Sequence, residues 1–346
     1  MTAWPLFGQP ENATATTTCP GCGNAVPVYA SYCESCGGPL TPTAPPPGTP
    51  PPADPTSSQT RRLGQRASET LTCPHCGGRI DADGYCQQCG ARAPNPRDHL
   101  ETCPAPWVAG VTDIGRFHSR NEDALALWAD GERAVLVICD GVSTSADADV
   151  ASLAAAVRAQ DVLVQGITSG TPSFVDAVAQ ANQAVIEQTD PNNPSAASAT
   201  LAAAVLDGDS LSYANLGDTR VYWIGETDAA LLSTDDSMAQ EFIDQGMARQ
   251  AAEAMPQAHA ITKWLGRDAE DIVPVTGEFT MAGPGWVLVC SDGLWNYASD
   301  APTLAARTRE LAGADDDPLV VARRLVEWAN DQGGHDNITV ALARHR

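Results

Sequence analysis

The chain has 346 residues, of which 43% are hydrophobic and 18% are charged, so it can bury a sizeable core and is not globally disordered. Its 20 basic and 43 acidic residues give a net charge of −23, and nearly all of this charge lies after Pro104. Such an acidic surface repels phosphate backbones and anionic lipids, so we expect neither nucleic acid nor a membrane as a partner.

The sequence shows no targeting or anchoring segment. It contains no uninterrupted run of about eighteen apolar residues, and its first residues lack a basic region followed by an apolar stretch. We therefore expect a cytoplasmic protein, and the length predicts two or three domains.

The first part of the chain contains four Cys-x-x-Cys pairs, each followed by glycine. Such a turn directs two thiolates at one point, and two turns together make a tetrahedral site for Zn²⁺, with iron as the less common occupant. Two alternatives are disulfides and a redox site. Disulfides do not suit a chain without a secretion signal, and a redox site would not require four Cys-x-x-Cys pairs. We predict two zinc ribbons, one over residues 17–38 with Cys19, Cys22, Cys33 and Cys36, the other over 71–92 with Cys73, Cys76, Cys86 and Cys89.

Two linkers are expected around the second ribbon. Residues 39–70 begin with nine prolines between positions 39 and 55, a composition that gives an extended spacer or, alternatively, a proline-motif ligand. Residues 93–106, in which Pro94, Pro96 and Pro104 mark a boundary, are expected to connect the ribbon to a large domain over residues 107–346.

Acidic residues stand at the ends of the strands predicted in the large domain. The apolar runs 135–139 and 286–291 lead into Asp140-Gly141 and Asp292-Gly293, and the strand 211–216 leads into Gly217-Asp218. A further strand, 337–342, begins just after Asp336. Oxygen ligands without paired His or Cys suit Mg²⁺ or Mn²⁺. One Asp-Gly is usually an ordinary turn, but the set predicts an acidic metal site.

Three helices are predicted, over residues 148–164, 173–189 and 316–332. Together with antiparallel strands in mixed order, they indicate an α+β domain in which helices cover a sheet sandwich.

Five motifs occur in a specific order along the large domain. They are Asn121-Glu122-Asp123-Ala124, Val137-Ile138-Cys139-Asp140-Gly141, Gly217-Asp218-Thr219-Arg220, Val289-Cys290-Ser291-Asp292-Gly293-Leu294-Trp295 and Gly334-His335-Asp336-Asn337-Ile338-Thr339-Val340. With these motifs the chain resembles the metal-dependent serine/threonine phosphatases of type 2C, bacterial type, from about residue 108 to 343. The resemblance implies a central antiparallel β-sandwich flanked by helices, with a two-metal centre at one end.

The resemblance also implies roles for individual residues. Asp140 would bridge two Mn²⁺ or Mg²⁺ ions, the Gly141 carbonyl would bind one of them, and Asp292 and Asp336 would complete the other. Glu122 and Asp123 would act mainly through water, and Asp218 would hold a weaker third ion. Residues 234–266 match the mobile flap of bacterial members.

The implied chemistry is hydrolysis of phosphoserine and phosphothreonine by a water that the two ions activate and hold in line with phosphorus. The ions also neutralise the charge that develops on the phosphoryl oxygens. No phosphoenzyme is required, so a nucleophilic cysteine is not expected.

Two positions depart from the family pattern. His118 stands where the family commonly has a phosphate-binding Arg, and we predict that it contacts substrate phosphate or protonates the leaving alkoxide. Arg116 or Arg120 could supply the cation instead, and His118 would then be an ordinary surface histidine. Val142 follows Asp140-Gly141 where the family often has a glycine-rich or histidine-bearing run, which affects the proton donor rather than metal binding.

Three functions compete. The first is an active phosphatase that opposes a serine/threonine kinase and uses its ribbons to recruit phosphorylated substrates or partners. The second is a catalytically weak adaptor that binds phosphoproteins through the ribbons. The third, a nucleic-acid binder, is disfavoured by the charge. The presence of all four acids, Asp140, Asp218, Asp292 and Asp336, favours the enzyme.

Overall fold

The computed structural model describes residues 16–18, 25–27, 72–81, 84–315 and 317–346, and it divides the chain into two units, Met1–Ala93 and Pro94–Arg346. The first predicted ribbon is represented only by β1 (Thr16–Thr18) and β2 (Ala25–Pro27), which pair antiparallel. Its cysteines and the proline-rich linker 39–70 lie outside the described residues.

Residues 72–81 and 84–93 form what we call the cysteine module, in which one turn occurs twice. The Gly77 N–H donates to the Cys73 carbonyl at 2.9 Å, and the Gly90 N–H donates to the Cys86 carbonyl at 2.8 Å. Both glycines have φ near +70°, a conformation that side chains with a Cβ rarely adopt. The glycine after each Cys-x-x-Cys pair therefore closes the turn.

The large unit contains two antiparallel sheets. The first has the strand order β11-β10-β14-β15-β4-β3 and the second has β13-β9-β8-β6-β5. The strands of the first sheet are β3 (His99–Ala105), β4 (Val108–Asp113), β10 (Arg220–Gly225), β11 (Ala229–Leu231), β14 (Gly285–Cys290) and β15 (Ile338–His345). The strands of the second are β5 (Ala124–Asp130), β6 (Arg133–Cys139), β8 (Leu201–Asp207), β9 (Ser210–Leu216) and β13 (Val275–Thr280).

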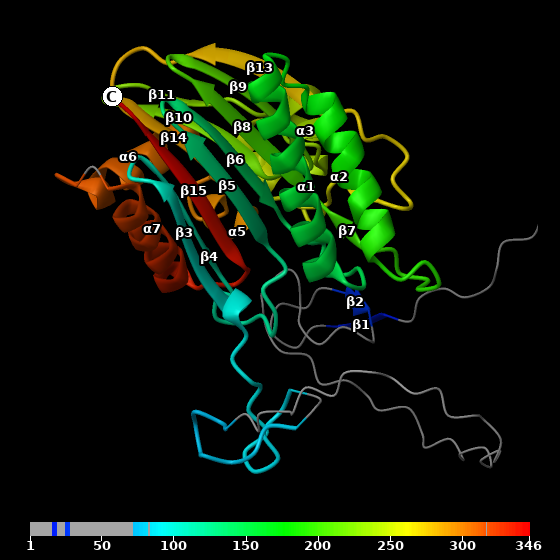
Figure 1. The fold of residues 1–346 in the computed structure, drawn as a ribbon. Coiled ribbons are helices and arrows are strands. Elements are labelled where there is room, and N and C mark those ends of the chain that lie inside the picture. Colours follow the sequence, from blue (N-terminus) through cyan, green and yellow to red (C-terminus); the bar gives the residue numbers. More distant parts are fainter. Residues whose placement is uncertain (1–15, 19–24, 28–71, 82–83, 316) are drawn as a thin grey trace, which may run out of the picture. The chain divides into compact units, whose positions relative to one another are not determined.

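Helices cover the outer face of each sheet (Figure 1). The pair α1 (Ala148–Ser169) and α2 (Phe174–Gln188) packs on the second sheet, and α6 (Ala301–Ala312) and α7 (Pro318–Gln332) pack on the first. A third apolar layer, which includes Leu136, Trp223 and Val289, fills the space between the sheets. The α+β sandwich flanked by helices that the sequence predicts is confirmed.

The helix predictions are confirmed apart from small shifts at their ends. Ser173 and Asp317 accept backbone N–H groups of the first turns of α2 and α7, as short polar side chains do at helix starts. By length and composition, α1 is apolar enough to cross a bilayer, but 44% of that window is buried. Its buried face packs on β5 and β6, as in the core helix of a globular domain.

The remaining elements are short. They are η1 (Pro96–Asp98), α3 (Met238–Asp244), α4 (Arg249–Glu253), α5 (Asp292–Trp295), and the pair β7 (Ser198–Ala199) and β12 (Leu265–Gly266). The flap segment 234–266 thus contains α3, α4 and a strand that pairs with β7.

Residues 93–106, predicted as a linker, instead hold η1 and the edge strand β3. The prediction was wrong because a proline disrupts a helix or strand mainly at positions whose backbone N–H must donate a hydrogen bond. Pro96 occupies the first turn of η1, and Pro104 lies at a register irregularity between Thr102 and Ala105 on the sheet edge, both of which tolerate proline.

Candidate metal centre and active site

The predicted ligand residues stand at strand ends of both sheets. Asp140 follows β6 and Asp218 follows β9 in the second sheet, whereas Asp292 follows β14 and Asp336 precedes β15 in the first. With Asp123 they influence one another electrostatically. We call these five acids the carboxylate cluster. The structure therefore brings together side chains that are up to 213 positions apart in the sequence, from Asp123 to Asp336.

Hydrogen bonds fix the backbone beneath the cluster. The Asp140 N–H donates to Thr200 Oγ1 at 3.1 Å, and the Thr200 and Thr219 hydroxyls lie 2.5 Å apart. The indole N–H of Trp295 donates to the Asp218 carbonyl at 2.9 Å. Both motif turns of the second sheet are thus held by buried neighbours.

Gly141 and Gly293 permit close approach of backbone segments. A Cβ at Gly141 would lie 2.6 Å from the Ala148 carbonyl oxygen and 2.7 Å from that of Glu122, and one at Gly293 would lie 2.0 Å from the Asn337 oxygen. No residue with a side chain fits at such distances. The glycines beside these two acids therefore allow the backbone segments to approach closely.

The carboxylate cluster carries more negative charge than its surroundings offset. Burial raises the pKa of Asp140 and Asp292 well above their ordinary value, and the neighbouring carboxylates raise both further. Burial also raises the pKa of Asp123 to about 7, and burial together with Asp235 raises that of Asp218 to about 7. A divalent cation would reverse these shifts.

The donor set fits a hard divalent cation. Asp292 Oδ1 is buried and has no hydrogen-bond partner, while its Oδ2 accepts from Asn296 at 3.1 Å. A buried carboxylate oxygen is rarely left unpaired, because no hydrogen bond then compensates for the free energy of its desolvation. All side-chain ligands here are oxygens, which Mg²⁺ and Mn²⁺ prefer.

Glu122 and Asp123 are fixed by partners that the sequence did not single out. The Glu122 N–H donates to Asn337 Oδ1 at 2.7 Å, and Ser143 Oγ donates to Glu122 Oε2 at 2.6 Å. Asp123 is buried and accepts from Ser291 Oγ at 2.7 Å. Asn337 and Ser291 are parts of the recognised motifs, but their partners lie far away in sequence, so only the structure shows what they hold.

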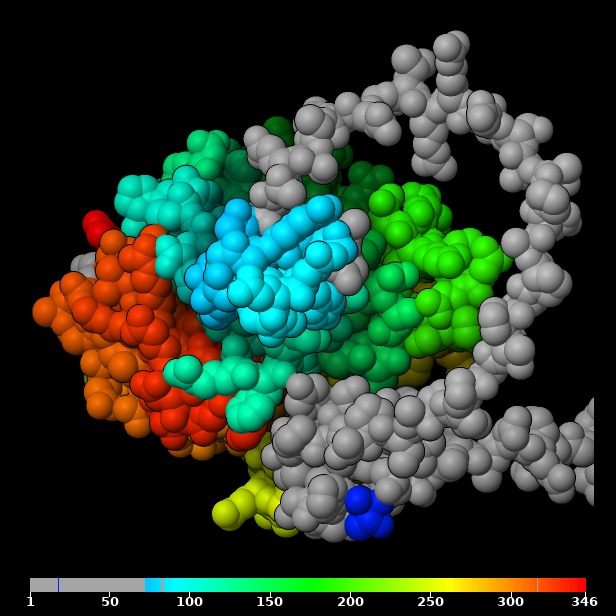
Figure 2. Space-filling view, turned by 90° about the horizontal axis from the view of Figure 1, so that it is seen from below, coloured from blue at the N-terminus to red at the C-terminus, as the bar shows by residue number. Residues whose placement is uncertain are grey.

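His118 lies beside the carboxylate cluster. Its Nε2 is 3.2 Å from Asp336 Oδ1. Arg116 instead donates to the Asn330 carbonyl at 3.0 Å and pairs with Asp331 on α7, and Arg120 pairs at 3.9 Å with Asp149. In the space-filling view, the segment around residue 116 lies along the red end of α7 (Figure 2). Of the three basic side chains that could bind the substrate phosphate, His118 is the one that contacts a predicted metal ligand.

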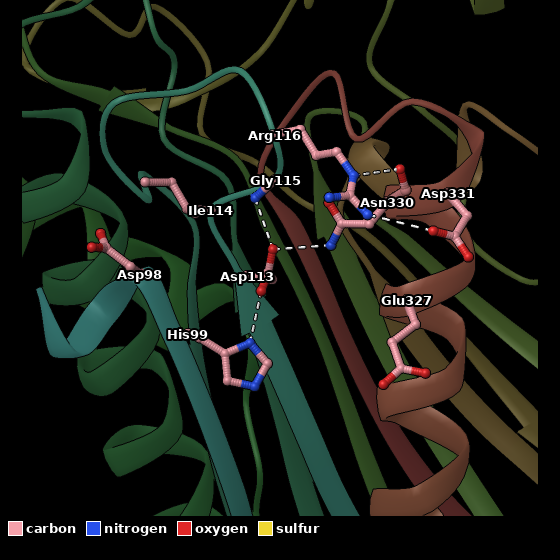
Figure 3. A pocket seen from close by; sticks show the side chains of 9 residues that line it. All are labelled: Asp98, His99, Asp113, Ile114, Gly115, Arg116, Glu327, Asn330 and Asp331. Atoms are coloured by element: carbon pink, nitrogen blue, oxygen red, sulfur yellow. Dashed lines mark hydrogen bonds and ion pairs between the residues drawn. The ribbon is translucent and has the colours of Figure 1, made fainter. Parts of the chain in front are cut away.

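The large unit has one cavity next to Gly141 and another next to α7. One, of about 320 Å³, begins at Val142 beside Gly141 and reaches Pro194 and, on the flap segment, Ile261 and Trp264. The other, of about 570 Å³, lies between β3, β4 and α7 (Figure 3). Neither cavity is lined by a predicted metal ligand, but the smaller one includes Val142, the residue after Gly141, and therefore adjoins the candidate active site.

The four cysteines of the cysteine module converge as predicted. Their sulfurs all lie within 4.8 Å of one another, with Cys73–Cys89 at 3.6 Å and Cys76–Cys86 at 3.5 Å. Zn–S bonds of about 2.3 Å in a tetrahedron require sulfurs about 3.8 Å apart. The Cys89 and Gln88 N–H groups lower the pKa of Cys86 to about 6, which favours the thiolate. The thiols are free, so the geometry suits an ion rather than disulfides.

Comparison with known proteins identifies the family of the large unit. The family model for protein phosphatase 2C matches residues 115–329. The chain is 26% identical over 241 residues to protein phosphatase PhpP of Streptococcus pneumoniae, a match that covers 68% of this chain and 96% of PhpP. It is 29% identical over 243 residues to serine/threonine protein phosphatase PstP of Mycobacterium tuberculosis, covering 68% of this chain and 44% of PstP.

Solved structures share the fold of the large unit. The phosphatase MsPP of Mycobacterium smegmatis, in complex with cacodylate, is 32% identical with a TM-score of 0.56, and the match covers 68% of this chain and 97% of MsPP. The PstP catalytic domain in complex with two manganese ions has a TM-score of 0.52 and covers 69% of this chain and 98% of that domain. At 23% identity, this second likeness shows the fold alone.

Proposed function

The chain belongs to the protein phosphatase 2C family, and on that premise we propose that this protein phosphatase hydrolyses phosphoserine and phosphothreonine in proteins, opposing a serine/threonine kinase. The observation that carries the proposal is the convergence of five carboxyls from two sheets, with one buried oxygen of Asp292 left without a partner. The relatives named serine/threonine phosphatases support the substrate class.

The carboxylate cluster would hold two Mn²⁺ or Mg²⁺ ions. Asp140 would serve both ions, the Gly141 carbonyl would bind one of them, Asp292 and Asp336 would complete the other, and Asp218 would hold a third, weaker ion. Bound there, the ions would supply a Lewis acid that makes water nucleophilic at neutral pH and neutralises phosphoryl charge. Glu122 and Asp123 would act from a second layer.

The chain's own residues position the substrate and the proton. His118, oriented by Asp336 at 3.2 Å, would donate either to a phosphoryl oxygen or to the leaving Ser or Thr oxygen. The cavity from Val142 to Trp264 would receive the peptide beside the phosphorylated residue.

We extend the proposal to the cysteine module. Cys73, Cys76, Cys86 and Cys89 would bind Zn²⁺, supported by sulfurs within 4.8 Å of one another. The module would recruit the phosphorylated substrate or a partner protein.

The test is hydrolysis of a phosphothreonine peptide by EDTA-stripped full-length protein, with and without millimolar Mn²⁺. We expect Mn²⁺-dependent turnover that Asp292→Ala abolishes and that Asp161→Asn, a change at an exposed acid of α1, leaves intact. If the folded wild-type protein shows no turnover but retains phosphopeptide, the adaptor hypothesis replaces the enzyme.

A further inference from the structure

Arg97 stands at the start of the large unit, ahead of the residues that match the family model. It lies in η1, where its N–H donates to Asn95 Oδ1 at 3.0 Å and the Asn95 N–H donates to Asp98 Oδ2 at 2.8 Å. These two bonds form a capping box that fixes the direction in which the Arg97 side chain leaves the backbone.

The guanidinium of Arg97 bridges two segments of the candidate active site. Its Nη2 donates to the Asp123 carbonyl at 2.9 Å and its Nη1 donates to the Asp149 carbonyl at 2.6 Å. The side chain is three-quarters buried, with 25% of its surface exposed. The planar fork of arginine can serve two acceptors in different directions, which a lysine ammonium on its flexible stem cannot do with the same geometry.

The two bridged carbonyls each belong to the residue that follows one in contact with Gly141. The Gly141 N–H donates to the Glu122 carbonyl at 3.2 Å, and a Cβ at this position would lie 2.6 Å from the Ala148 oxygen. Arg97 binds the next residue in each segment, Asp123 and Asp149. It therefore ties together the two backbone segments that contact the Asp140-Gly141 turn.

The start of α1 also carries an unusual backbone conformation, and there Ser152 Oγ donates to the Asp149 carbonyl at 3.3 Å as well. Asp147, the residue before α1, has a φ of +56°, and among non-glycine residues of the described ranges it alone has a positive φ. Its side chain makes no capping hydrogen bond to α1. A residue with a Cβ held in this conformation needs surrounding structure to keep it there, and the bond from Arg97 to Asp149 supplies part of it.

The backbone on which Arg97 stands is itself anchored. Asn121 Nδ2 donates to the Arg97 carbonyl at 2.8 Å, and the Ile114 N–H donates to the Asp98 carbonyl at 2.8 Å. On the next residue, His99 Nδ1 lies 2.7 Å from Asp113 Oδ2, while Asp113 Oδ1 accepts from Gly115 and Asn330 (Figure 3). The guanidinium is thus presented from a fixed base.

We infer that Arg97 is a positioning residue of the metal centre, which sets the separation between the Glu122-Asp123 segment and the start of α1 and thereby the geometry at Asp140-Gly141. The inference rests on the proposed function for the identity of the ions. It also places the start of the catalytic unit at residues 94–98, immediately after the cysteine module.

The test compares Mn²⁺ binding to EDTA-stripped, full-length wild type, Arg97→Met and Arg97→Lys by calorimetry. Loss of an outer-sphere partner typically weakens metal binding about 10–100-fold, and we expect Arg97→Met to fall in that range. The Mn²⁺ affinity of Arg97→Lys should lie closer to that of Arg97→Met than to that of wild type. Lysine keeps the positive charge but lacks the planar guanidinium, so it does not bridge both carbonyls. Wild-type affinity in Arg97→Lys would overturn the inference.

A matched control and a metal-free measurement complete the design. Arg323→Met breaks the pair that ties β3 to α7 through Glu101 without touching the active-site segments, and it should bind Mn²⁺ as wild type does. In EDTA, amide hydrogen exchange at residues 121–124 and 141–151 should rise in Arg97→Met and remain unchanged in β8.

The exchange measurement separates the two proposals. Absence of Mn²⁺ binding by wild type would refute the proposed function, while raised exchange in those two segments would still uphold the positioning role. Unchanged exchange in Arg97→Met would refute the positioning role whatever the ion.

Discussion

The cysteine module and the carboxylate cluster are both sets of metal-ligating side chains, but they stand in opposite relations to the hydrophobic core. In the module, the buried apolar residues are Cys73, Ile80 and Cys86. Two of these three core residues are therefore predicted zinc ligands. In the large unit, three apolar layers lie between and outside the sheets, and the carboxyls stand at the strand ends.

The difference concerns what an ion does for the fold. A module whose ligands are its core gains its stability from the ion, as small zinc domains do. The large unit has a core without any ion, and its cluster instead opposes folding, because like charges are held together. Replacing a metal-ligating side chain should therefore destabilise the cysteine module but stabilise the metal-free form of the large unit.

The largest effect is expected from Cys86→Ser. Zinc binding contributes about 10–16 kcal/mol to the folding of small zinc domains at neutral pH, so the module should lose its structure. Amide hydrogen exchange should show loss of protection at residues 72–93, with the Tm of the large unit unchanged, and bound zinc should fall by one equivalent. Protected amides in a zinc-free module would contradict the comparison.

Asp292→Asn should show the opposite sign in the large unit. The change removes a carboxyl whose ionised form the cluster disfavours, so at pH 8 the metal-free protein should gain roughly 1–3 kcal/mol of stability, visible as a higher Tm in EDTA. Turnover with Mn²⁺ should fall by on the order of a hundredfold or more. Asp161→Asn, on the exposed side of α1, is the control; a lower Tm for Asp292→Asn than for this control would refute the repulsion argument.

The pH dependence of the metal-free protein sharpens the same contrast. Asp123 and Asp218 have a pKa of about 7 in the fold against an ordinary value of 3.8, so the folded state binds more protons than the unfolded chain. Stability should therefore fall as pH rises from about 4 to 7 and remain low above 7. Raising one carboxyl pKa over that range corresponds to roughly 4 kcal/mol.

Thermal unfolding between pH 5 and pH 8, in EDTA and in Mn²⁺, measures this effect. Mn²⁺ should raise the Tm more at pH 8 than at pH 5, because the cluster is then ionised. An equal or smaller Mn²⁺ effect at pH 8 would show that these carboxyls do not bind the ion.

His118→Ala should have the smallest effect on stability and a moderate effect on rate. Loss of a proton donor typically costs about 10²–10⁴-fold in rate, so we expect kcat/KM for a phosphothreonine peptide to fall at least a hundredfold. His118→Arg should restore phosphate binding without restoring the proton donor. The control is Arg116→Ala, which should leave kcat/KM unchanged because the Arg116 side chain contacts Asn330 and Asp331. An unchanged kcat/KM in His118→Ala would show that His118 is an ordinary surface residue.

The sequence predicted those parts of the molecule that depend on local pattern. The β6 and β14 strands are short apolar runs that end in Asp-Gly, and the starts of α2 and α7 carry capping residues, so both features can be recognised within a few positions. The two Cys-x-x-Cys turns of the module are equally local. The residue roles at the metal centre remain predictions.

The supporting contacts could not be predicted, because their partners are far apart in the chain. Arg97 contacts a carbonyl 52 positions away, and Asn337 accepts from a residue 215 positions away. The strand β3 was hidden for a different reason, since a polar edge strand with prolines has little apolar periodicity. Arg97 lies within that misread segment.

The place of β15 in the first sheet also bears on how the enzyme arises during synthesis. This strand, which follows Asp336, lies between β14 and β4, so β4 waits for its neighbour until more than 200 residues have been added. A chain stalled or cut before Asp336 would lack both this acid and the strand that joins the two halves of the sheet. We therefore expect premature fragments to be inactive, so that phosphatase activity would report a complete sandwich.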